Sequence, residues 1–204
     1  MIRAVIFDLG GVVLDSPFDV IAARERQDGF HISLFNQVAS APDGAWAKHE
    51  TGKISRDEFI TAFEAECAVV GRVIDARRLL DDIEAYARPR MRVIEVIGKL
   101  RESGFLVAAL TNNWESPNAD WEVASFQALF DVFVESWVEG VHKPDRRIYL
   151  AACTRLRVEP VECVFLDDIG RNLKTARDLG MATIKVTEVE QAMAELGDLV
   201  GMVL

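Results

Sequence analysis

The chain has 204 residues, of which 50% are hydrophobic and 27% charged, a composition typical of a folded globular protein. Its 33 acidic residues outnumber its 23 basic residues and leave a formal charge of −10, which disfavours nucleic-acid and anionic membrane partners. No uncharged stretch reaches the ~18 residues of a membrane span, and the N-terminus lacks a basic leader. We therefore expect a soluble, cytoplasmic protein, whose oligomeric state the sequence leaves open.

Short apolar runs alternate with stretches of helical periodicity along most of the chain. The first run ends at Asp8, and a helix near residues 93–100 is predicted to stop at Gly104. A second helix is predicted to begin near Asp145, and a third to span residues 188–196. The apolar runs predict strands at residues 4–7, 105–110, 132–134, 163–166 and 182–186. This alternation predicts an α/β fold with a Rossmann-like parallel sheet.

One long segment departs from this alternation. Residues 16–88 show helical spacing and no convincing strand, so they predict an all-helical insertion, a cap domain, in a core formed by residues 1–15 and 89–204. Ser55 and Glu58 have the spacing of a capping box and predict a helix start.

Polar side chains stand at the ends of three predicted strands. Asp8 follows the first strand, Thr111 and Asn112 the second, and Asp167 and Asp168 the fourth. Carboxyl ends of parallel strands meet at one edge of a sheet, so these side chains are expected to share a crevice. Three carboxylates in one crevice repel each other, and a hard divalent cation such as Mg²⁺ would relieve this repulsion.

The three cysteines have no C-x-x-C spacing, so we expect buried, reduced thiols and no zinc site.

Four motifs in chain order resemble those of the haloacid dehalogenase-like hydrolase superfamily. They are FDLGGVV at residues 7–13, LTN at 110–112, HKPD at 142–145 and FLDDIGRN at 165–172. Each motif alone is weakly specific, but the set spans nearly the whole chain. Two of the stretches are especially similar to the phosphatase domain at the N-terminus of mammalian soluble epoxide hydrolases.

The resemblance implies a Mg²⁺-dependent phosphatase of a small phosphorylated metabolite. Asp8 would attack phosphorus and form an aspartyl-phosphate, with Lys143 as the second catalytic residue. The substrate-binding residues implied are Leu9, Gly10, Thr111, Asn112 and Lys143.

The resemblance also implies a set of metal ligands. Mg²⁺ would lie between Asp8, the backbone carbonyl of Gly10 and Asp168. Asp167 would orient the lysine or a metal-bound water, and Asn172 would brace the loop of the fourth motif.

The residue at Gly10 departs from the family pattern. Phosphatases of the family usually have a second aspartate here, which protonates the leaving group and then activates water. General acid–base help is typically worth roughly 10²–10⁴ in rate, so the glycine predicts a slow or leaving-group-selective phosphatase. The alternatives are a catalytically inactive module that binds phosphate and a 2-haloacid dehalogenase, against which the Asp167–Asp168 pair argues.

The histidines have no metal-binding spacing in the sequence. We expect His31, His49 and His142 to be solvated or locally hydrogen-bonded, although His142 is set apart because it adjoins Lys143.

Overall fold

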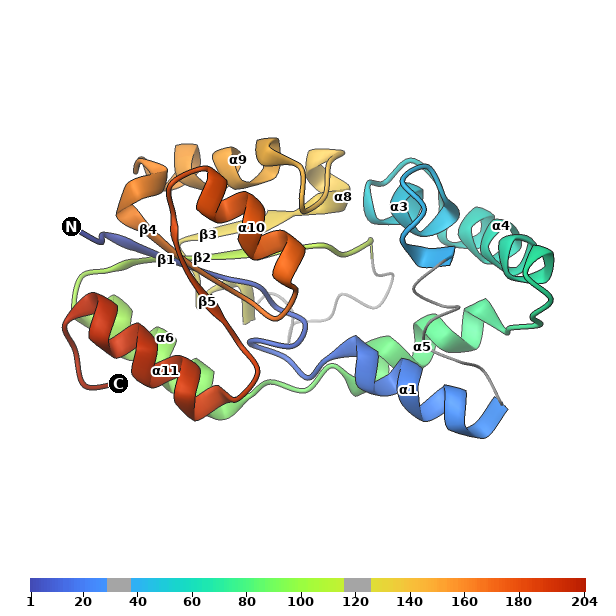
Figure 1. Cartoon of the computed structure of the whole chain (residues 1–204), viewed down its shortest axis with the longest axis horizontal. Helices are drawn as coiled ribbons and strands as arrows, with labels where there is room; N and C mark the ends of the chain where they lie inside the picture. The colour runs from blue at the N-terminus through green and yellow to red at the C-terminus, as the bar shows by residue number, and fades with distance from the viewer. Residues whose placement is uncertain (29–37, 116–125) are drawn as a thin grey trace.

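The computed structural model describes residues 1–28, 38–115 and 126–204, and it shows five parallel strands in the order β3-β2-β1-β4-β5 (Figure 1). The strands are β1 Ala4–Phe7, β2 Leu106–Thr111, β3 Val132–Glu135, β4 Cys163–Asp167 and β5 Ala182–Lys185. The predicted α/β fold with a parallel sheet is therefore confirmed.

Strand β1 lies at the centre of the sheet and is buried along its whole length. Val5 pairs with Val107 of β2 on one side and with Val164 of β4 on the other. Because helices cover both faces, each residue of β1 is apolar, which explains the uninterrupted run in the sequence.

Two pairs of helices cover the two faces of the sheet (Figure 1). Helices α6 and α11 pack on one face, where Val96 and Met193 belong to the same core. Helices α9 and α10 pack on the other face around Tyr149 and Phe165. The core helices are α6 Met91–Glu102, α8 Ser136–Glu139, α9 Arg146–Leu156, α10 Gly170–Asp178 and α11 Val189–Val200, with a 3₁₀ turn at Pro160–Glu162.

The predicted helix boundaries follow local chemistry. The Asp145 side chain accepts the backbone N–H of Arg147 and caps α9. Gly104 has a φ of +86° just after α6, a conformation that glycine adopts without strain.

In the described residues, the segment between β1 and α6 consists of helices joined by loops and turns and contains no strand. Residues 29–37 of the predicted insertion lie outside the described residues. The predicted capping box forms, with the Ser55 Oγ accepting from Glu58 N–H and the Glu58 carboxylate accepting from Ser55 N–H. These helices share a core of their own around Phe59, Phe63 and Leu80. They are α1 Pro17–Asp28, α3 Ala45–Glu50, α4 Arg56–Val69 and α5 Ala76–Tyr86.

The chain enters and leaves this helical segment at one point beside the sheet. Leu14 and Pro89 form an antiparallel bridge, flanked by hydrogen bonds from Asp15 N to Arg88 O at 3.0 Å and from Arg90 N to Val13 O at 2.8 Å. The helices therefore lie next to the loop that follows β1 (Figure 1).

Two further expectations concern the cysteines and membrane helices. The three cysteines are buried and free, as predicted. None of the described helices combines the length and apolarity that crossing a bilayer requires.

Candidate active site

Asp8 is fixed in position by the strand that precedes it. Its backbone N–H donates to Leu166 O at 2.9 Å, which extends the β1–β4 ladder by one residue. Its Oδ1 accepts the N–H of Leu9 at 2.7 Å. The chain then turns sharply, with Gly11 at a φ of +82°, and Leu14 N–H returns to Leu9 O. The turn leaves the Asp8 carboxylate at the C-terminal edge of the sheet.

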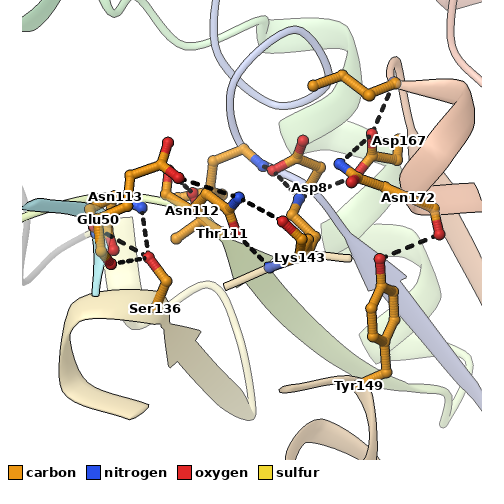
Figure 2. Close-up of polar contacts among 12 residues, drawn as sticks. Asp8, Glu50, Thr111, Asn112, Asn113, Ser136, Lys143, Tyr149, Asp167 and Asn172 are labelled. Atoms are coloured by element: carbon orange, nitrogen blue, oxygen red, sulfur yellow. Dashed lines mark hydrogen bonds and ion pairs between the residues drawn. The ribbon is translucent and has the colours of Figure 1, made fainter. Parts of the chain in front are cut away.

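Lys143 lies between two carboxylates. Its Nζ is 2.7 Å from Asp8 Oδ1 and 2.9 Å from Asp167 Oδ2 (Figure 2). The side chain of Lys143 is only 1% exposed, and that of Asp167 is fully buried. A buried ammonium needs such partners, because removing a charge from water costs several kcal/mol.

Asp167 is held on every side by protein groups. Its Oδ1 accepts the backbone N–H of Ile169 at 2.7 Å, and its Oδ2 accepts the Asn172 amide at 3.0 Å. Tyr149 donates its hydroxyl to the backbone carbonyl of Asn172 at 3.1 Å (Figure 2). With Lys143 also bound, Asp167 has the contacts of a residue that positions others.

Asp168 differs from Asp167, because one of its carboxylate oxygens, Oδ1, is buried and has no hydrogen-bond partner among the described residues. Carboxylate oxygens of Asp8, Asp167 and Asp168 all lie within 4.8 Å of one another. An orphaned oxygen beside two more carboxylates fits a hard divalent cation, because such cations take oxygen ligands. The residues present therefore fit Mg²⁺.

Burial and mutual repulsion perturb these groups. Burial raises the pKa of Asp8, the charges of Asp167 and Asp168 raise it further, and Lys143 partly opposes them. Burial and the charge of Asp167 raise the pKa of Asp168 to about 6. Burial alone would lower the pKa of Lys143, but its two carboxylate partners together raise it. The lysine therefore stays charged. The ionised forms of Asp8 and Asp168 are destabilised, and a bound cation would offset this destabilisation.

Thr111 and Asn112 lie where β2 ends. Asn112 accepts the N–H of Lys143 at 2.8 Å through its side-chain oxygen and donates to the Lys143 carbonyl at 3.1 Å. This pair of hydrogen bonds fixes the backbone of Lys143 against the second motif (Figure 2). Thr111 is buried, and its hydroxyl makes only a long contact of 3.4 Å to Asn112 O.

The structure brings the predicted residues to one edge of the sheet. Leu9 enters through its backbone, since its side chain is buried and its N–H binds Asp8. Gly10 follows in the same turn and packs against Pro17 of α1. The set comprises Asp8, Leu9, Gly10, Thr111, Asn112, Lys143, Asp167, Asp168 and Asn172, and their roles remain predictions.

Sequence reasoning missed a contribution from the helical segment. Glu50 at the end of α3 accepts from His142 Nδ1 at 2.8 Å and from Asn112 Nδ2 at 3.4 Å. Its backbone carbonyl accepts the Ser136 hydroxyl at 2.6 Å (Figure 2). No motif marks Glu50, so only the fold reveals this contact, whereas the position of His142 beside Lys143 was a weak signal.

A large cavity of about 1310 Å³ opens over this edge of the sheet. Asp8, Lys143 and Asp168 line the part of the cavity at the strand ends. Side chains of the helical segment and of the core form the remaining wall, which is rich in aromatic and aliphatic groups: Phe18, Ile21, Trp46, Ile83, Tyr86, Trp114, Phe126, Phe133 and Trp137.

Comparison with known proteins decides the family. The haloacid dehalogenase-like hydrolase family model matches residues 2–180. The chain belongs to the haloacid dehalogenase-like hydrolases. The resemblance predicted from the four motifs is thus confirmed, and this family member is a hydrolase.

Curated relatives are similar over nearly the whole chain. It is 34% identical over 209 residues to acyl-CoA dehydrogenase family member 10 of Mus musculus, covering 99% of the chain and 19% of that protein. It is 30% identical over 221 residues to bifunctional epoxide hydrolase 2 of Sus scrofa, covering 100% of the chain and 40% of that protein. The hydrolase chain thus spans less than half the length of these two relatives. A sesquiterpene phosphatase of Aspergillus oryzae is 25% identical over 206 residues, covering 98% and 97%.

Solved structures share the fold of this hydrolase. A protein of Porphyromonas gingivalis described as a predicted haloacid dehalogenase-like family hydrolase superimposes with a TM-score of 0.73 at 23% identity, covering 98% of both chains. A family enzyme of Bacteroides thetaiotaomicron, in complex with magnesium and inorganic phosphate, gives a TM-score of 0.65 at 21% identity and covers 91% and 94%. At these identities the matches show the fold alone.

Proposed function

We propose that the protein is a Mg²⁺-dependent phosphatase that hydrolyses a phosphate monoester through an aspartyl-phosphate. The observation that carries the proposal is the arrangement around Asp8. Its carboxylate is fixed at a strand end, lies 2.7 Å from the buried Lys143 ammonium and borders the orphaned oxygen of Asp168. Phosphoryl transfer depends mainly on such positioning and charge neutralisation.

The hydrogen bonds of Asp8 assign its two oxygens. Oδ1 accepts from Leu9 N–H and Lys143 Nζ, whereas Oδ2 has no hydrogen-bond partner among the described residues. Oδ2 is therefore the oxygen free to attack phosphorus. The Oδ2–P bond forms as the ester P–O bond breaks, and the leaving oxygen takes the electron pair and a proton. Water then attacks the aspartyl-phosphate, releasing phosphate and restoring Asp8.

Asp8, Asp168 and the carbonyl of Gly10 would hold the Mg²⁺. When bound, the ion would neutralise charge on the transferring phosphoryl group. Lys143 and the Thr111 hydroxyl would hold phosphoryl oxygens, and Asn112 keeps the Lys143 backbone in place. Asp167 and Asn172 keep the lysine amine aimed at Asp8.

The helical segment would act as a cap that selects the organic part of the substrate. Most of the cavity wall beyond the phosphate end is aromatic or aliphatic, and its 1310 Å³ exceeds the space that a phosphate needs. We therefore propose a small metabolite with a largely apolar organic group. The relative named as a sesquiterpene phosphatase is consistent with this proposal.

The decisive experiment measures hydrolysis of para-nitrophenyl phosphate and acetyl phosphate with and without Mg²⁺. Wild-type protein and Asp8→Asn are compared, with Asp19→Asn of helix α1 as a matched carboxylate-to-amide control, because Asp19 is exposed and does not line the cavity. Activity that requires Mg²⁺ and Asp8 but not Asp19 supports the phosphatase. Folded protein that binds Mg²⁺ and phosphate without turnover supports the inactive phosphate-binding module. Release of halide from 2-chloropropionate without metal supports the dehalogenase.

The substrate class needs a separate measurement. We expect kcat/KM to be higher for a long-chain or isoprenyl phosphate than for glycerol phosphate, and Trp46→Ala to reduce this preference. Equal values for polar and apolar esters would contradict an apolar leaving group.

A further inference from the structure

The site lacks a side chain at the position that usually exchanges protons with the leaving group. Gly10 stands there, so an acid must come from elsewhere if alkyl esters are substrates. An in-line displacement puts the leaving oxygen on the side of phosphorus opposite Asp8, toward the cavity and the helical segment. A replacement acid must therefore line the cavity on that side.

His142 and Glu50, the latter from helix α3, form a hydrogen-bonded pair among the residues that line this cavity. The Nδ1 of His142 lies 2.8 Å from Glu50 Oε2, and Glu50 Oε1 accepts the indole N–H of Trp46 at 2.8 Å. Both members of the pair line the cavity that contains Asp8. A carboxylate that accepts from Nδ1 fixes the imidazole orientation and leaves Nε2 for proton exchange.

The pair is joined directly to the phosphate end of the cavity. Glu50 also accepts from Asn112 Nδ2 at 3.4 Å, and Asn112 holds both backbone polar groups of Lys143. His142 precedes Lys143, whose amine contacts Asp8. One rigid set of contacts therefore relates the imidazole to the nucleophile.

Most other acidic groups around the cavity have partners, and Glu115, which also lines the cavity, is exposed. Among the described residues, the Nε2 of His142 has no hydrogen-bond partner. The carboxylates with partners are Asp15 with Arg90, Asp81 with Arg56, Glu84 with Arg56 and Trp114, and Glu135 with Asn113 and Trp137. An imidazole is also the side chain best suited to exchange protons near neutral pH.

We propose that His142 is the general acid and base of this hydrolase and that Glu50 is its positioning residue. This inference rests on the proposed phosphatase activity. In the first step the ester P–O bond breaks, its electron pair goes to the leaving oxygen, and the Nε2 proton of His142 goes to the same oxygen. In the second step His142 takes a proton from the attacking water, and the P–O bond to Asp8 breaks, returning its electrons to the carboxylate.

The test is a leaving-group series from para-nitrophenyl phosphate to a primary alkyl phosphate. A nitrophenolate departs without a proton, so His142→Gln should lower kcat/KM for the alkyl ester by about 10²–10⁴-fold and for the aryl ester by much less. Glu50→Gln should give a smaller loss with the same dependence on the leaving group. His142→Gly should regain alkyl ester turnover when imidazole is added.

Glu84→Gln is the matched control, because Glu84 also links the helical segment to the core, through Trp114 Nε1 at 3.0 Å. It should affect aryl and alkyl esters to the same degree. The inference would be overturned if folded His142→Gln lost kcat/KM equally for both esters and imidazole did not rescue His142→Gly. The pair of Glu50 and His142 would then only join the helical segment to the core. Wild-type protein without Asp8-dependent activity on any ester would instead overturn the phosphatase itself, and the inference with it.

Discussion

Lys143 Nζ lies 2.7 Å from Asp8 Oδ1, and both side chains are almost fully buried. This ammonium contacts the acidic cluster, which also contains Asp167 and Asp168. When all three carboxylates are ionised, the four groups have two more negative than positive charges. A single divalent cation balances that excess, which is the electrostatic reason for expecting Mg²⁺.

Removing the lysine charge should destabilise the fold as well as the site. Lys143→Met leaves two buried carboxylates without a cation, and we expect the free energy of unfolding to fall by about 3–5 kcal/mol. Urea denaturation of metal-free protein measures this loss. Lys174→Met is the matched control, because Lys174 pairs with Asp178 on an exposed helix surface and should cost less than about 1 kcal/mol. Equal losses in the two variants would contradict the buried ion pair.

Asp168 should make metal-free protein less stable as the pH rises. Its pKa of about 6 in the folded state exceeds the ordinary value of 3.8, so the folded state binds the proton more tightly. The resulting stability is present below about pH 4 and is lost as the pH rises through about 6. Asp168→Asn should therefore raise the free energy of unfolding by on the order of 1–3 kcal/mol at about pH 8 and leave it unchanged at about pH 4.

In metal-free protein at about pH 8, Asp168→Asn should be more stable than wild type, and saturating Mg²⁺ should make wild type the more stable of the two. The ion stabilises only a folded state that binds it, so wild-type protein should gain stability at about pH 8 while Asp168→Asn gains little. Denaturation curves with chelator and with Mg²⁺ measure both effects. Equal stabilisation of the two proteins by Mg²⁺ would show that Asp168 is not a ligand.

Gly11 keeps the turn after Asp8 close to the acidic cluster. A Cβ at this position would clash with Asp168 Oδ2, and its φ is +82°. Gly104→Ala is a matched control, because Gly104 has a φ of +86° and a Cβ there would meet nothing within 4 Å. We expect Gly104→Ala to cost only the left-handed strain of about 1–2 kcal/mol, and Gly11→Ala to cost clearly more and to weaken Mg²⁺ binding. Similar costs in denaturation and unchanged Mg²⁺ affinity in calorimetry would contradict the close approach.

The sheet and the acidic cluster were predictable because strand ends carry local signals. An apolar run that stops at Asp8 gives both the strand and the position of the carboxylate, and parallel pairing then brings the strand ends together. The exact residues at which the strands end were predicted less accurately. Thr111 and Asp167 lie one residue beyond their apolar runs, but pairing with Glu135 and Lys185 keeps them in the sheet.

Contacts with the helical segment were not predictable in this way. Glu50 and His142 are 92 residues apart, and neither has a spacing that relates it to the other. The contact of Gly10 with Pro17 has the same origin, since it depends on how α1 leaves the sheet. Such pairs follow from the packing of two cores, which local periodicity does not encode.

The contact between Gly10 and Pro17 decides how an aspartate can be introduced at position 10. A Cβ at Gly10 would lie 3.1 Å from Pro17 Cδ, so the proline must shift by a few tenths of an ångström to admit a side chain. Gly10→Ala measures the effect of this crowding alone, and Gly10→Asp adds the acid. In a His142→Gln background, we expect Gly10→Asp to raise kcat/KM for a primary alkyl phosphate at least about tenfold over Gly10→Ala, because it returns a proton donor to the leaving group.

The aryl ester serves as the internal control for that comparison. Since its leaving group needs no proton, Gly10→Asp and Gly10→Ala should hydrolyse it at similar rates in the same background. Equal alkyl ester activity of the two variants, with aryl activity retained, would show that proton transfer does not limit the His142→Gln enzyme. A gain confined to the alkyl ester would instead place the lost function of His142 at the leaving oxygen, the atom that the family's aspartate serves.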